Sequence, residues 1–242
     1  MSRHQKVKYY VKKQIIRFLK WLLPAYAIAP LVVNLFVNFL GYNAIGAARG
    51  MLSFYDFSIG LDKEIPMMPV FMYVYIGAFV QWVVGFVTCV REDKEFCYRF
   101  MSAELCAKIL ALICFLLIPS TIARPEISGG SAADVLTRFV YSIDAPVNLF
   151  PSIHVLESWF CLRAAFKQKK TGKIYPWVTG IMTVLVAASV VLVKQHVCVD
   201  IIGGIAVFEI GMLMTRKFSF AGLYRKVTDI FMNIAGRAAK ES

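Results

Sequence analysis

Apolar residues in this chain occur in runs of about 20, the length at which an α-helix crosses the hydrocarbon core of a bilayer. Such runs must be helical, because backbone polar groups in lipid have to be paired within their own segment. Only 17% of the 242 residues are charged, against about a quarter in a soluble domain. The sequence therefore predicts an all-α integral membrane protein, with any chemistry at helix ends and in short loops.

Six transmembrane helices are predicted, at residues 21–40, 66–90, 105–123, 153–166, 174–193 and 199–214. The fourth is the shortest of these segments and contains Glu157. The predicted organisation is a basic segment over residues 1–20, a six-span membrane domain over 21–215 and a basic tail over 216–242. No internal repeat supports an inverted-repeat transporter.

The orientation follows from lysine and arginine, which are retained on the cytoplasmic side of a span. With both termini cytoplasmic, 22 of the 27 basic residues lie on that side and 5 on the other. The net charge of +12 is then a topology signal, so it gives no support to a nucleic-acid partner. We expect a multi-pass protein of the cell membrane, and we expect its cysteines to be small buried hydrophobes without disulfides.

The outer loops carry one further pattern. Residues 132–143 place their apolar side chains on one helical stripe, which predicts a short amphipathic helix on the outer interface. The loop charges Asp62, Lys63 and Asp144 could reach a lipid head group, but we expect them to be solvated.

Polar residues also gather at the predicted outer ends of the spans. They are Arg124 after the third span, Ser152 and His154 at the start of the fourth, and His196 and Asp200 between the fifth and sixth. If the sixth helix begins near His196, the spacing of four places His196 and Asp200 on one helical face. The carboxylate can then accept the imidazole N–H and fix its tautomer, which leaves the other ring nitrogen as a nucleophile.

A phosphate group would suit these residues. Free N–H groups and the dipole at the helix start near Ser152 favour an anion, and Arg124 can bind two phosphate oxygens at once. Lys194 adds a point charge. Together they predict phosphoryl transfer in which His196 attacks phosphorus and His154 protonates the leaving oxygen, without a metal ion or other cofactor.

Each feature alone has a simpler structural interpretation. A histidine and an aspartate at a membrane boundary commonly form an interfacial ion pair. Ser152 can merely cap a helix, and Arg124 or Lys194 can merely anchor in the head groups. The functional interpretation rests on the convergence of three separate segments on one membrane face.

The motifs that contain these residues resemble those of the type 2 phosphatidic acid phosphatase superfamily. Pro151-Ser152-Ile153-His154 is similar to its second motif, Pro-Ser-Gly-His, and His196-Val-Cys-Val-Asp200 to the end of its third, Ser-Arg-x5-His-x3-Asp. Arg124-Pro125 matches the end of its first motif, Lys-x6-Arg-Pro. Over roughly residues 105–215, the resemblance implies a six-helix core and metal-independent chemistry on a phosphorylated lipid. It also implies that His196 is the nucleophile, Asp200 its orienting partner and His154 the general acid, with Arg124 and Ser152 on the phosphate.

The chain departs from this family pattern at three places. The first-motif lysine is Leu117, the second-motif glycine is Ile153, and the third-motif Ser-Arg pair is Ser189-Val190. We expect Lys194 to replace part of the missing charge and Ile153 to lie on the phosphate. An aliphatic residue before the second-motif histidine is similar to the Pro-Ser-Leu-His form of the inositol phosphorylceramide synthase and sphingomyelin synthase-like branch.

Two acidic residues lie inside predicted spans, where an ionised carboxylate is unfavourable. Glu157, three residues after His154, is expected to support that histidine, and Glu209 to make a helix contact of unassigned role. The Gly203-Gly204 pair is expected to permit close helix packing.

The leading function is hydrolysis of a phosphomonoester or diphosphate lipid, through a phosphohistidine, at the outer membrane face. One alternative replaces water by an alcohol acceptor, which makes the protein a phosphotransferase. A second alternative is a non-catalytic lipid-binding or transport protein, which the missing cations favour and the intact histidines oppose. The fold alone does not separate these functions, and the residues leave the lipid and the oligomeric state open.

Overall fold

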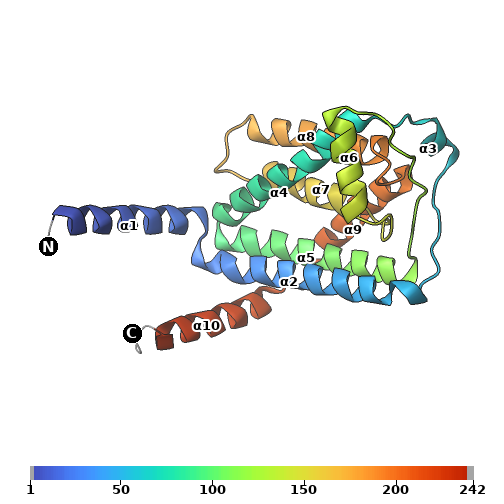
Figure 1. The fold of residues 1–242 in the computed structure, drawn as a ribbon. Coiled ribbons are helices and arrows are strands. Elements are labelled where there is room, and N and C mark those ends of the chain that lie inside the picture. The colour runs from blue at the N-terminus through green and yellow to red at the C-terminus, as the bar shows by residue number, and fades with distance from the viewer. Residues whose placement is uncertain (1–2, 239–242) are drawn as a thin grey trace.

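The computed structural model describes residues 3–238, and this part of the chain is helical apart from loops and two isolated β-bridges. The prediction of an all-α fold is confirmed. Both marked chain ends lie at one end of the helical bundle, while α3 (Gly60–Glu64) lies at the other (Figure 1). Residues 1–2 of the predicted basic segment and residues 239–242 of the predicted tail lie outside the described residues.

The other α-helices are listed in chain order. They are α1 (Arg3–Leu22), α2 (Ala25–Ala48), α4 (Met72–Glu92), α5 (Lys94–Leu117), α6 (Ala132–Ile143), α7 (Ile153–Ala165), α8 (Tyr175–Leu192), α9 (Cys198–Met214) and α10 (Ala221–Ala238). Two short 3-10 helices, η1 (Arg49–Met51) and η2 (Pro69–Phe71), follow α2 and precede α4.

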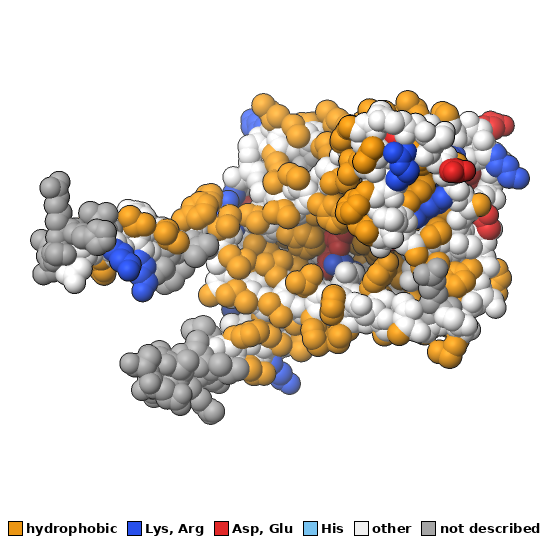
Figure 2. Space-filling model, viewed as in Figure 1, with side chains coloured by type: hydrophobic (Ala, Val, Ile, Leu, Met, Phe, Trp, Pro, Cys, Tyr) orange, Lys and Arg blue, Asp and Glu red, His pale blue; other side chains and the backbone are white. Residues whose placement is uncertain are grey.

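Among the described residues, four segments are long and apolar enough to cross a membrane: α2, residues 69–92, α5 and α8. Helices also occur at the other two predicted spans, but α7 has 13 residues and α9 has 17. Their lengths of about 20 and 26 Å fall short of a hydrocarbon core of about 30 Å. The six-span count therefore stays a prediction. Hydrophobic side chains are spread widely over the face shown in Figure 2, as expected for a surface in contact with lipid.

Several boundaries differ from the predicted ones, among them the end of α2, which runs to Ala48 and not to residue 40. The basic N-terminal segment is itself helical, and α2 begins only after Pro24. Helix α5 begins at Lys94, eleven residues before the predicted span, because Asp93 caps it by accepting Phe96 N at 2.7 Å. It also ends at Leu117, and residues 118–123 form a loop that pairs with Tyr55 and Val147.

Helix α7 lies in the middle of the bundle, where it packs against α4, α8 and α9, while α5 packs against α2 and α9. Phe160 of α7 is fully buried and meets the rings of Phe100 and Phe208 with centroids 6.3 and 6.0 Å away. The predicted amphipathic helix forms as α6, with the predicted bounds, and crosses the long helices (Figure 1). This packing brings the first turns of α7 and α9 together.

Candidate active site

The first turns of α7 and α9 are joined through their backbones. Ser152 N donates to Asp200 O at 3.1 Å. A Cβ atom at Gly204 would lie 2.6 Å from Ser152 O, and one at Gly203 would lie 2.5 Å from the ring of Phe150. Only glycine permits this approach, so the predicted close packing at Gly203-Gly204 is confirmed.

His196 and Asp200 are in contact, with His196 Nδ1 3.1 Å from Asp200 Oδ2. Both are buried, His196 at 8% exposure and Asp200 at 0%. The reason for the contact differs from the one predicted, because α9 begins two residues after His196, at Cys198. Asp200 turns back at the helix start, accepts Val197 N at 3.0 Å and reaches His196 from there. Because Asp200 engages Nδ1, the Nε2 atom of His196 remains for chemistry.

His154, the second residue of α7, lies among aromatic rings. Its imidazole stacks on Tyr75 with ring centroids 4.0 Å apart, and Trp82 lies at 5.1 Å. The centroids of His154 and His196 are 6.1 Å apart. The structure thus brings the two predicted catalytic histidines together. It also surrounds His154 with aromatic rings, which the sequence spacing did not indicate.

Both histidines line a cavity of about 560 Å³, here called the groove. Its walls come from α2, α4, α5, α6, α7 and the loop after α6, and most of its side chains are apolar. The aromatic ones include Tyr75, Phe79, Trp82, Phe115 and Phe139. The groove can therefore accept a hydrocarbon chain next to the histidines.

Arg124 is held in place by three neighbours. Its Nη1 donates to the carbonyl of Asp144, its Nη2 donates to Gln195 Oε1, and its guanidinium lies 4.5 Å from the ring centre of Tyr141. Among the described residues, no partner meets its buried Nε. Burial raises the pKa of the half-buried Asp144 carboxyl, and Arg124 opposes that rise. Gln195 and Tyr141 were not predicted as site residues, since Gln195 fills an unspecified position of the third motif and Tyr141 lies outside the motifs.

Lys194 lies on a second cavity of about 470 Å³, here called the vestibule, which Arg124 and His196 also line. Its Nζ donates to the carbonyls of Asp62 and Ile65 at 2.8 and 2.6 Å. An ammonium has three donors, so one N–H remains for a phosphate. The predicted role of Lys194 stays a prediction, and the structure adds a second role in holding the loop at α3.

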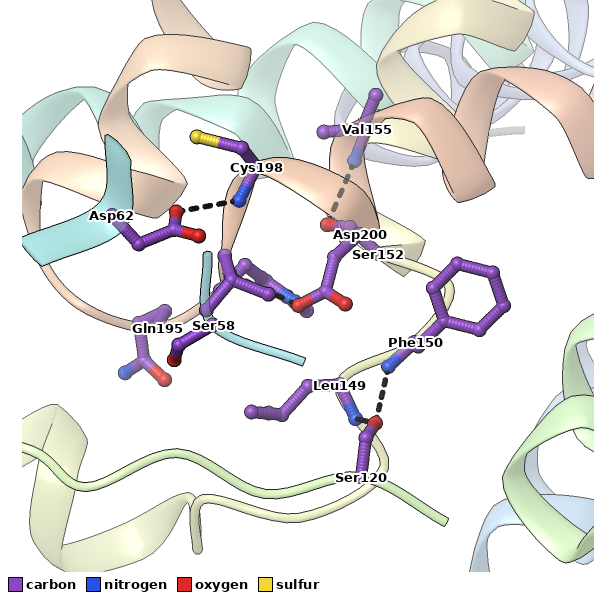
Figure 3. A network of polar contacts seen from close by, with 12 residues as sticks. Ser58, Asp62, Ser120, Leu149, Phe150, Ser152, Val155, Gln195, Cys198 and Asp200 are labelled. Carbon is purple, nitrogen blue, oxygen red and sulfur yellow. Dashed lines mark hydrogen bonds and ion pairs between the residues drawn. The ribbon is translucent and has the colours of Figure 1, made fainter. Parts of the chain in front are cut away.

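Asp62 lies against the start of α9, as Figure 3 shows. Its carboxylate accepts Cys198 N at 2.8 Å and Ile59 N at 2.9 Å, and the residue is 7% exposed. Burial alone would raise the pKa of this carboxyl, but the hydrogen bonds from Ile59 and Cys198, together with the charge of Lys194, outweigh burial and the pKa is lowered. The expectation that Asp62 is solvated is wrong, whereas its neighbour Lys63 is exposed. The signal was missed because Cys198 is 136 residues away.

Ser152 caps α7, since its Oγ accepts Val155 N at 3.4 Å. The backbone N–H groups of Ile153 and His154 meet no acceptor within residues 3–238. They remain for an anion at the helix start. The loop before α7 is fixed by Ser120, whose Oγ accepts the N–H groups of Leu149 and Phe150 (Figure 3).

The acids of the spans have partners other than those expected. Glu157 pairs with Lys108 at 2.8 Å, and no hydrogen bond joins it to His154 in the described structure. Glu209, whose contact had no assigned role, pairs with Arg163 at 2.7 Å and accepts Trp159 Nε1 at 2.8 Å.

Two of the positions at which the family motifs have a cation contain uncharged residues in this chain. Leu117 is 71% exposed at the end of α5, and Val190 is fully buried in α8. All six cysteines are free.

Comparison with known proteins gives one match. The family model described as the PAP2 superfamily matches residues 55–214, which include every residue of the site described above. No curated protein and no solved structure matches the chain.

Proposed function

Since the chain belongs to the PAP2 superfamily, we propose that it is a membrane lipid phosphatase that hydrolyses a phosphomonoester or diphosphate lipid through a phosphohistidine. Membership of the superfamily indicates phosphatase or phosphotransferase-type activity in general. The observation that carries the finer proposal is the contact between His196 Nδ1 and Asp200 Oδ2, beside a groove that also holds His154.

In the first step, His196 Nε2 attacks phosphorus while the bond from phosphorus to the lipid oxygen breaks. His154 gives its proton to that oxygen, so the lipid leaves as a neutral alcohol or, from a diphosphate, as a monophosphate. Asp200 stabilises the positive charge that develops on the His196 ring. A protonated His154 faces the rings of Tyr75 and Trp82, whose π faces attract a cation.

In the second step, water attacks the phosphohistidine. His154 takes a proton from that water, the N–P bond breaks, and inorganic phosphate leaves while both histidines return to their starting states. Negative charge on the transferring group is balanced by Arg124 and by the free N–H groups of Ile153 and His154. Lys194 supplies its remaining donor from the vestibule side.

The lipid and the phosphate are proposed to occupy different surroundings. The apolar groove receives the hydrocarbon chain, and the phosphate lies between the histidines, beside Arg124. Both marked chain ends lie at the end of the bundle opposite α3 (Figure 1), and the basic residues favour cytoplasmic termini. We therefore place the site at the outer face of the cell membrane.

Two alternatives differ in what happens to the phosphoryl group. A phosphotransferase would use the same first step and pass the group to an alcohol, and Ile153 before His154 is the feature that favours it. A non-catalytic lipid-binding protein would have no need for a buried, oriented His196–Asp200 pair, so this geometry counts against it.

A phosphoenzyme experiment tests the proposal. The detergent-solubilised protein is mixed with a lipid monophosphate labelled at phosphorus, quenched within the first turnover, and examined for label that is stable to base and released by acid. We expect such label in the wild type, none in His196→Ala, and an unchanged amount in His4→Ala, since His4 lies in α1. Label that persists in His196→Ala, or turnover that a chelator abolishes, would contradict this mechanism.

A further inference from the structure

Three ionisable side chains meet inside the bundle, away from the catalytic histidines. Lys108 Nζ lies 2.6 Å from Glu104 Oε1 and 2.8 Å from Glu157 Oε1. Glu104 and Lys108 belong to α5 and Glu157 to α7, and their exposed fractions are 0, 7 and 4%. These three residues, here called the triad, take no part in the proposed reaction.

The surroundings of the triad contain no further permanent charge among the described residues. From α2, Asn34 donates Nδ2 to Glu104 Oε2 and to the carbonyl of Met101, and Tyr224 of α10 contacts Asn34 at 3.4 Å. The other titratable groups that face the triad are the hydroxyl of Tyr224 in α10 and the neutral thiols of Cys89 in α4 and Cys161 in α7. No second cation balances the second carboxylate.

The charge count is therefore one positive and two negative. An uncompensated carboxylate in the interior costs several kcal/mol and is normally neutralised by taking up a proton. A second observation points the same way: Glu157 Oε2 is buried and has no hydrogen-bond partner within the described chain. We infer that the triad is a proton-binding site, in which Glu104 and Glu157 share one proton at neutral pH.

The geometry favours a proton over a metal cation. Lys108 already occupies the space between the two carboxylates, at hydrogen-bond distance from both. A hard cation would need about six oxygen ligands, whereas Glu157 Oε2 is the one carboxylate oxygen of the triad without a partner in the described chain. A proton needs one oxygen, and it restores neutrality without moving a helix.

The inference is tested by equilibrium unfolding in mixed micelles between pH 5 and pH 9. The unfolded carboxyls ionise near pH 4.3, whereas the folded triad keeps one proton, so folding takes up a proton. The equilibrium constant for unfolding of the wild type, divided by that of Glu157→Gln or Glu104→Gln, should therefore rise with pH. The rise should be up to tenfold per pH unit until the folded triad loses its proton. Each variant replaces one carboxyl group by an amide of nearly the same shape. The remaining carboxylate is balanced by Lys108, so the variant has no proton to retain.

Infrared spectroscopy at pH 7 provides a second readout. The wild type should show the carbonyl stretch of a protonated carboxylic acid, and each glutamine variant should lack it. Glu209→Gln serves as the matched control, because Glu209 is another carboxylate of the helical bundle but has Arg163 as its partner. That variant should keep the band and the wild-type pH dependence.

Three outcomes would overturn the inference. Parallel pH curves for the wild type and both triad variants would mean that the triad binds no proton, as would absence of the acid band from the wild type. Stability that follows sodium concentration and not pH would identify a metal cation. None of these results depends on whether the protein is a phosphatase.

Discussion

Ser152 N donates to Asp200 O at 3.1 Å, and this one backbone hydrogen bond joins the segment that carries His154 to the segment that carries His196. The two histidines that we propose as catalytic therefore lie on segments that the main chain holds together. This contact exists because Gly204 lets the backbones approach.

Gly204→Ala tests that dependence. A Cβ atom would lie 2.6 Å from Ser152 O and 3.2 Å from Leu156 N, so the start of α7 must move away from α9. Because a displacement of about 1 Å at a reacting centre can lower the rate about 100-fold, we expect a loss of that order in kcat. Gly46→Ala, at a helical position with open space around its Cβ, should leave kcat unchanged in the same lipid phosphate assay.

Asp62→Asn should weaken the attachment of the α3 loop to α9 at neutral pH. The pKa of Asp62 is lowered in the folded protein, so its stabilisation is present above the unfolded pKa of about 4 and is lost as the pH falls through the lowered value. We expect a loss of roughly 1 kcal/mol at pH 7 that shrinks as the pH falls through this lowered pKa.

Thermal unfolding in detergent at several pH values measures this difference. Glu64→Gln removes an exposed carboxylate from the same short helix, so it should have no comparable effect. A stability difference for Asp62→Asn that does not shrink as the pH is lowered would contradict the role of the ionised carboxylate.

Lys194→Ala should lower kcat at least about tenfold, because about 1.4 kcal/mol of transition-state stabilisation corresponds to that factor. Lys194→Arg should retain much of the activity. Lys194 has a backbone φ of 50°, and alanine and arginine meet the same backbone cost there as lysine, so the variants isolate the charge. Lys63→Ala, which removes an exposed cation from the same vestibule, is the matched control, and steady-state kinetics separates kcat from KM.

The structure allows Lys194 to act in two ways. If KM rises and kcat is unchanged in Lys194→Ala, its role is to hold the loop at Asp62 and Ile65 and not to stabilise the transition state.

Ile143→Trp should narrow the groove at its exposed edge, where Ile143 is 67% exposed. A long hydrocarbon chain would then bind less well, so we expect kcat/KM to fall about tenfold for a long-chain lipid phosphate and to change little for a short-chain one. Val135→Trp places the same ring on an exposed position of α6 that does not line the groove. Equal losses for both chain lengths would argue against the groove as the chain-binding site.

The orientation is tested by cysteine labelling of intact cells with an impermeant reagent. Gly130→Cys and Gly172→Cys form a matched pair, because both glycines are exposed and have open space around their Cβ positions. We expect labelling at residue 130 and none at residue 172 above the wild-type background. The reverse pattern would place the proposed site in the cytoplasm.

Local patterns were enough to predict much of this structure. The bounds of α6 follow from its stripe of apolar residues, and the contact between His196 and Asp200 was expected, although it forms at the start of α9 and not along one helical face. The sequence also indicated which segments carry the site, because each motif is continuous along the chain.

Partners that are distant in the sequence were not predictable in this way. Asp62 was expected in solvent because its partner, Cys198, follows 136 residues later. Glu157 was assigned to His154 on the same helix, whereas it pairs with Lys108 on α5. Hydropathy also placed the start of α5 too late, since the first turns of this helix contain the charged residues Lys94, Glu95 and Arg99.

The short length of α7 bears on how deep in the membrane the proposed site lies, and so on whether the phosphate or the hydrocarbon chain of a lipid has to move to reach it. With its cytoplasmic end at the membrane boundary, a helix of 13 residues begins about 10 Å inside the opposite boundary of the hydrocarbon core. Drawing a lipid chain into water costs about 0.8 kcal/mol for each methylene group, and a recessed site avoids that extraction. In the proposed mechanism, the phosphate would therefore descend to meet Arg124 and the N–H groups of α7, and the chain would stay within the leaflet throughout turnover.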